Sequence, residues 1–183
     1  MRRKLTMTPR VSRALFLDFV YALEMAIACL LSYWAMTVGL MRLVDMSTDL
    51  LGGMWAAISA IFVFRENELD SVLAGISRLI ATCVSFALCL PYLWLLPATP
   101  VGMGVLLAIG TVVMILLHRR GDIITTGITT VVVMVVAAID PHDAWRQPLL
   151  RLADTVVGIA LGVACQWIGF HLVQRTMGAR QVS

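Results

Sequence analysis

The sequence predicts an all-α integral membrane protein with six transmembrane helices, arranged as a 3+3 inverted repeat with both termini in the cytoplasm. Three observations lead to this prediction. Hydrophobic residues make up 60% of the 183 residues and charged residues 14%, against roughly 45–50% and 25% in an average soluble domain. The apolar residues gather in six membrane-length stretches. Basic residues gather in alternate connections between these stretches, and one short pattern recurs in the third and the sixth.

Six spans are predicted between a basic amino-terminal tail (residues 1–18) and a short carboxy-terminal tail (residues 174–183). Their bounds are residues 19–40, 50–64, 72–96, 101–117, 123–139 and 149–173. The first stretch is longer than the apolar region of a signal peptide, which has about 7–15 residues, and it contains Glu24, so we interpret it as an uncleaved span. Pro91 lies inside the third span and is expected to bend or interrupt it.

Basic residues distinguish the two sides of the predicted membrane domain. Arginine and lysine occur in the amino-terminal tail, after the second and fourth spans, and in the carboxy-terminal tail, whereas the opposite side receives only Arg42 and Arg146. Because cytoplasmic loops carry the excess of basic residues, both termini are predicted to be cytoplasmic. An even number of spans agrees with this prediction, because it places both termini on the same side of the membrane. The expected location is the bacterial inner membrane, as a multi-pass protein.

A short pattern is shared by the third and sixth spans. Residues Arg78–Thr82 match residues Arg151–Thr155 at an offset of 73 (151 minus 78), and the same offset takes Ser85 to Gly158. Each span therefore carries an arginine, a threonine one turn later and small residues beyond, all on one helical face. Because three spans reverse the direction of the chain, the pattern predicts an inverted repeat with a substrate path at the interface of the two halves.

Ionisable residues inside the spans mark the candidate site, because a charge at the bilayer centre costs at least about 2.5–3.5 kcal/mol on insertion scales. Two interpretations of Arg78 stay open: contact with a transported anion, or an ion pair with Glu24, which is expected at comparable depth. Two interpretations of Arg151 also stay open. Its side chain contacts the anion, or it is structural and either reaches the membrane surface or pairs with Asp154. Either carboxylate, Glu24 or Asp154, is an alternative carrier of a coupled proton.

Thr82 and Thr155 are the predicted hydroxyl contacts of the substrate. The threonines within residues 125–130 either line a polar path or bond to their own helix backbone. Cysteines lie inside the spans and histidines at their ends without ligand spacing, so we predict no metal and no cofactor. No nucleophile-elbow or His-Glu-x-x-His motif is present, so we do not expect an enzyme. We also expect no nucleic-acid partner.

Three segments resemble the membrane domain of the fusaric acid resistance and aromatic acid exporter family, a superfamily that includes the plant aluminium-activated malate transporters. The segments are Trp55–Ala60, the Arg-Leu-x-x-Thr start of the third span, and Leu150–Gly162. The resemblance extends from about Phe16 to Val173. It implies a six-helix unit, expected to be a homodimer in the lipid bilayer, that exports aromatic or other carboxylates.

The resemblance also implies roles for the two arginines, because arginines on the third and sixth helices line the anion path in the malate-transporter branch. Arg78 and Arg151 occupy the matching motif positions. Family members often carry a large cytosolic helical region after the sixth span, and a Gln-Pro pair after the second, where this chain has Arg65, Glu66 and Asn67. The alternative function is therefore a non-transporting scaffold, or an accessory subunit of a larger efflux assembly.

Overall fold

The computed structural model describes residues 9–40, 49–65, 67–139 and 144–179. Within these residues all regular structure is helical, which confirms the predicted all-helical class. The main helices are α1 (Pro9–Trp34), α2 (Asp49–Val63), α3 (Glu68–Leu95), α4 (Pro100–Leu116), α5 (Ile123–Ile139) and α6 (Gln147–Ala179). A π-helical segment (Ala35–Leu40) continues α1, and short 3-10 turns precede α5 and α6. The outer parts of both predicted tails, and Arg42, lie outside the described residues.

Four helical segments in the described residues are long and apolar enough to cross a membrane. They are Asp18–Val38, Glu68–Leu95, Arg120–Ile139 and Ala144–His171. The remaining two predicted spans are apolar helices, but they are shorter. With 15 residues, α2 is about 22 Å long at 1.5 Å per residue, which is less than the roughly 30 Å of the hydrocarbon core.

Local sequence signals explain where helices begin. Thr99 is the residue before α4, its side chain accepts a hydrogen bond from the backbone N–H of Gly102 at 3.1 Å, and Pro100 occupies the first helical position. Glu68 and Asp70 lie in the first turn of α3, where carboxylates interact favourably with the helix dipole. These signals lie outside the apolar stretches, so α3 begins earlier than the apolar residues alone predict.

Of the two effects expected of Pro91, the interruption is wrong, because α3 continues as a helix to Leu95, and the bend stays a prediction. Proline removes one backbone hydrogen bond to the residue four positions earlier. That loss falls within the last two turns of a 28-residue helix. A single missing bond there does not end the helix.

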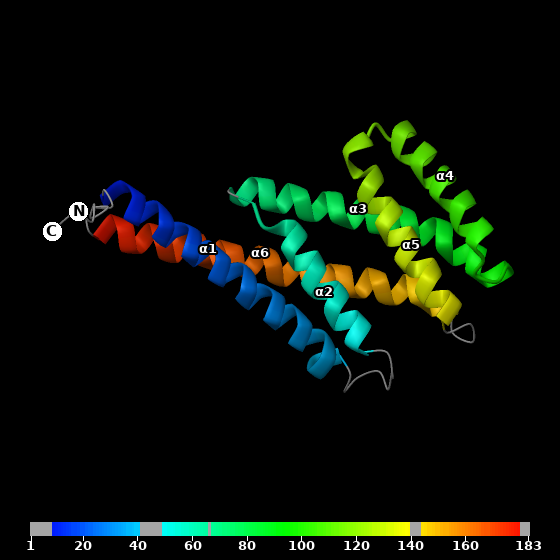
Figure 1. Cartoon of the computed structure of the whole chain (residues 1–183), viewed down its shortest axis with the longest axis horizontal. Helices are drawn as coiled ribbons and strands as arrows, with labels where there is room; N and C mark the ends of the chain where they lie inside the picture. Colours follow the sequence, from blue (N-terminus) through cyan, green and yellow to red (C-terminus); the bar gives the residue numbers. More distant parts are fainter. Residues whose placement is uncertain (1–8, 41–48, 66, 140–143, 180–183) are drawn as a thin grey trace, which may run out of the picture.

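The two halves of the chain pack on each other in a related way (Figure 1). In the middle, α3 and α6 lie against each other. In Figure 1, α1 and α2 accompany α6, whereas α4 and α5 accompany α3. The first two helices of the amino-terminal half, α1 and α2, therefore cover α6, and the first two helices of the carboxy-terminal half, α4 and α5, cover α3.

Small residues allow the closest of these contacts, between α2 and α6. A Cβ atom added at Gly162 would lie 3.1 Å from the Cα of Ala60, so the two backbones are in near contact. At the sequence offset of 73, this pair corresponds to Cys89 and Val133, which both belong to one buried cluster between α3, α4 and α5.

Candidate functional site

Arg78 lies in the interior of the helix bundle, with 2% of its surface exposed. Its guanidinium carbon is 5.1 Å from the centroid of the Trp55 ring and 4.4 Å from the centroid of the Phe62 ring. Both rings come from α2, and a spacing of seven residues puts them on one face of that helix. Two cation–π contacts therefore position the guanidinium between α3 and α2.

The guanidinium has no hydrogen-bond acceptor among the described residues. Nε, Nη1 and Nη2 of Arg78 are all buried without a partner. The indole Nε1 of Trp55 and the hydroxyl of Ser59, on the same side of α2, are also buried without a partner. An unsatisfied buried polar group costs about 1–3 kcal/mol, and a charged one costs more. The face of α2 that carries the two rings in contact with Arg78 therefore also carries two buried donors without a partner.

The predicted ion pair between Arg78 and Glu24 does not form. Glu24 lies against α6, where a Cβ atom added at Gly169 would overlap its carboxylate. The pair was expected because the two residues lie at comparable depth in the membrane. Depth does not determine which helices lie next to each other in the bundle. Both α2 and α6 contact α1 as well as α3, and they lie between the two helices.

Arg151 forms the ion pair that the sequence suggested. Its Nη1 is 3.0 Å from Oδ2 of Asp154, one turn further along α6, and both side chains are 2% exposed. Nη1 also donates to the carbonyl oxygen of Leu51 on α2 at 3.1 Å. The interpretation of Arg151 as a snorkelling side chain is wrong because the side chain points into the bundle. Its charge is compensated by Asp154, whereas no carboxylate of the described residues compensates the charge of Arg78.

The predicted hydroxyl contacts, Thr82 and Thr155, use their protons within their own helices. Thr82 donates to the carbonyl oxygen of Arg78 at 2.9 Å, and Thr155 donates to that of Arg151 at 2.7 Å. Back-bonding is also confirmed in α5, where the donors are Thr126, Thr129 and Thr130. An anion needs donors, so these threonines are less suitable partners than Trp55 and Ser59.

Sequence reasoning missed Trp55 and Phe62 as contacts of Arg78, and Ser59 as a buried donor on the same face of α2. Their spacing was available as a signal, since positions 55, 59 and 62 share one helical face. The pattern alone does not say which helix faces them. The packing of α2 against α3 supplies that information.

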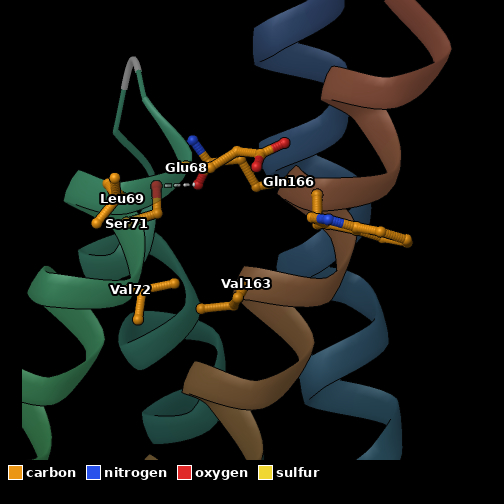
Figure 2. Close-up of a pocket in the computed structure, with 7 residues that line it drawn as sticks. Glu68, Leu69, Ser71, Val72, Val163 and Gln166 are labelled. Atoms are coloured by element: carbon orange, nitrogen blue, oxygen red, sulfur yellow. Dashed lines mark hydrogen bonds between the residues drawn. The ribbon is translucent and has the colours of Figure 1, made fainter.

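A cavity of about 180 Å³ lies between the beginning of α3 and the second half of α6 (Figure 2). At its edge Ser71 donates to Oε1 of Gln166 at 2.6 Å. Most of its lining is apolar, and the ionisable residue among its lining residues is Glu68. This cavity therefore offers no cation for an anion to contact. No group of three His, Cys, Asp or Glu side chains that would hold a metal is found in the described parts of the chain.

Close packing separates the cavity from Arg78. Ser71, Gly75 and Arg78 follow one another on the buried face of α3. A Cβ atom added at Gly75 would lie 2.9 Å from Cγ2 of Ile159 on α6. The contact between α3 and α6 is thus closed between the cavity and the guanidinium.

The chain matches a known protein family. The family model described as fusaric acid resistance protein-like matches residues 27–165, a range that includes Trp55, Ser59, Arg78 and Arg151. No curated protein and no solved structure matches the chain. The matched range runs from within α1 to within α6 and covers most of the sequence. The chain therefore belongs to the fusaric acid resistance protein-like family.

Proposed function

We propose that this protein is a membrane transporter or channel for organic anions, exporting aromatic or other carboxylates, in which Arg78 contacts the transported anion. Membership of the family indicates a membrane protein of the transporter type. The class of substrate is our inference from the site.

The observation that carries the proposal is the buried, uncompensated guanidinium of Arg78. A buried charge whose partner is missing is strongly unfavourable, by about 3–5 kcal/mol where it has been measured by removing one member of a buried pair. A carboxylate supplies both the opposite charge and the acceptors that the site lacks. The planar fork of an arginine also matches the two oxygens of a carboxylate.

The arrangement of helices supports a path at the same place. We propose that all six helices act as one membrane unit, related as an inverted repeat, with both termini on the cytoplasmic side. The matched packing of α2 on α6 and of α5 on α3 supports this relation. In inverted-repeat transporters the substrate lies at the interface of the repeats, and here that interface includes α3, which carries Arg78.

Movement of α3 relative to α6 is the step that opens this path. The hydrogen bond between Ser71 and Gln166 and the contact between Gly75 and Ile159 hold the two helices together beside the cavity. Separation of these contacts would join the cavity to the site at Arg78. In the conformation described here, the cavity between α3 and α6 is therefore closed off from Arg78.

Uptake into proteoliposomes tests the proposal. The purified full chain is reconstituted, and the uptake of labelled monocarboxylates and dicarboxylates is measured with and without an imposed pH gradient. We expect saturable uptake that is abolished by Arg78→Ala and retained by Cys83→Ala, a matched substitution at an exposed position of the same helix. Uptake that does not respond to the gradient would identify a channel rather than a proton-coupled exporter.

The alternative, a scaffold or accessory subunit, makes the opposite prediction. Such a protein reconstitutes as a monodisperse, folded species and moves none of the anions. Equal uptake by Arg78→Ala and by the unmodified protein would instead remove Arg78 from the site while leaving transport in place.

A further inference from the structure

We infer that the site takes an anion with a single negative charge, held by Arg78 together with the indole N–H of Trp55 and the hydroxyl of Ser59, so that monocarboxylates are preferred to dicarboxylates. Arg151 takes no part in this recognition. The inference rests on the proposed function and names the substrate class and the residues that select it.

Charge compensation inside the bundle supports a single negative charge. The charged side chains that are fully buried in the described residues are Arg78, Arg151 and Asp154. Arg151 and Asp154 compensate each other at 3.0 Å, so one positive charge remains. A second carboxylate would enter the same surroundings without a cation, and removing an ion from water without a partner costs several kcal/mol.

Hydrogen-bonding capacity supports a carboxylate as the charged group. A carboxylate has two oxygens with about four lone-pair sites. The guanidinium fork satisfies two of them with parallel N–H groups. The Trp55 N–H and the Ser59 O–H are buried without a partner among the described residues, on the face of α2 that carries the rings in contact with the guanidinium, and these two donors are the candidates for the remaining two sites.

Burial of Trp55 and Ser59 allows their donors to discriminate between anions. Trp55 is 3% exposed and Ser59 is fully buried, so neither donor is satisfied by water. Groups of this kind discriminate strongly, because a ligand that leaves them unpaired loses the hydrogen bond and keeps the cost of burial. A spherical anion such as chloride has one acceptor centre and does not match the planar fork.

Competition for uptake tests the preference for one charge. Proteoliposomes containing the full chain take up labelled benzoate while unlabelled benzoate, phthalate, hexanoate, adipate or chloride is added at pH 7.5. We expect each monocarboxylate to compete at least about tenfold better than the dicarboxylate of the same skeleton, since one unpaired buried charge exceeds the free-energy difference that a tenfold ratio requires. Equal competition by the members of each pair, or by chloride, would overturn the inference.

Two conservative variants test the donors. Trp55→Phe keeps an aromatic ring beside Arg78 and removes the N–H, and Ser59→Ala removes the hydroxyl. We expect each to raise the KM for benzoate about tenfold or more, which is the effect of losing a hydrogen bond to a charged group. Trp94→Phe, at a tryptophan that is 79% exposed, is the control and should leave KM unchanged.

The outcomes separate this inference from the proposed function. If the unmodified protein moves no anion, the proposed function fails. If it moves both charge classes equally well, or if Trp55→Phe and Ser59→Ala leave KM unchanged, transport stands and the assignment of the site to these donors and to one charge is wrong.

Discussion

Replacing Gly158 by alanine is expected to destabilise the protein by forcing α6 away from α2. A Cβ atom at this position would lie 2.8 Å from the Cβ of Ser59 and 3.0 Å from the backbone carbon of Ala56, and it would overlap the Ala56 carbonyl oxygen. Two of these three atoms belong to the backbone, so no side-chain rotation relieves the overlap. The helices must separate locally.

The size of the effect follows from these distances. Carbon atoms pack best at about 3.5–4.0 Å, so the contact with Ser59 alone requires a local separation of about 0.7–1.2 Å. Overpacking of a well-packed interior typically costs about 1–3 kcal/mol. Small residues at helix contacts in membranes serve the close approach that this separation would destroy.

Gly104 provides the matched control, because a Cβ atom added there meets nothing within 4 Å. Alanine has a higher helix propensity than glycine, by about 1 kcal/mol, and this gain applies to both substitutions. Gly104→Ala should therefore leave stability unchanged or raise it. The difference between the two variants isolates the cost of contact between the helices.

Thermal unfolding of the purified protein in detergent, followed by tryptophan fluorescence, measures the difference. A change of 1 kcal/mol corresponds to roughly 2–4 °C in a domain of 150–250 residues, so Gly158→Ala should lower Tm by about 2–12 °C relative to Gly104→Ala. Equal Tm values for the two variants would refute the close contact of α2 and α6 at Gly158.

The remaining predictions concern the buried polar groups. Arg78→Met removes an uncompensated buried charge, so we expect it to raise the free energy of unfolding by about 1–4 kcal/mol while abolishing uptake; a lower Tm than that of the unmodified protein would contradict the unpaired state of the guanidinium. Asp154→Asn leaves Arg151 without its carboxylate and should cost about 3–5 kcal/mol, with recovery when Asp154→Leu is combined with Arg151→Met; unchanged Tm in the single variant would argue against the ion pair. Gln166→Leu removes one acceptor of the Ser71 hydroxyl, which keeps the carbonyl oxygen of Asn67, and leaves the carbonyl oxygen of Arg65 without its donor, so it should cost about 1–3 kcal/mol. In a double-mutant cycle by chemical unfolding, strictly additive effects of Gln166→Leu and Ser71→Ala would show that the hydrogen bond contributes nothing.

Features that depend on one helix were predictable from the sequence. The bounds of α5 agree with the predicted span of residues 123–139, because a long apolar stretch bounded by polar residues forms a helix in almost any membrane context. The pairing of Arg151 with Asp154 was also predictable, since side chains three residues apart on a helix are neighbours whatever surrounds them. The same holds for the back-bonded threonines.

Features that depend on which helix lies beside which were decided by the tertiary structure. Arg78 was identified from the sequence because a charge inside an apolar stretch is costly, but of the two interpretations left open for it, the pair with Glu24 is wrong. Depth along the membrane normal can be estimated from position in the chain, whereas the order of helices around the bundle cannot. That order brings Trp55 and Phe62 of α2 to Arg78 and keeps Glu24 beside α6. The sequence thus determined which side chain carries an exceptional charge, and the packing of the helices determined that no carboxylate of the described residues compensates it.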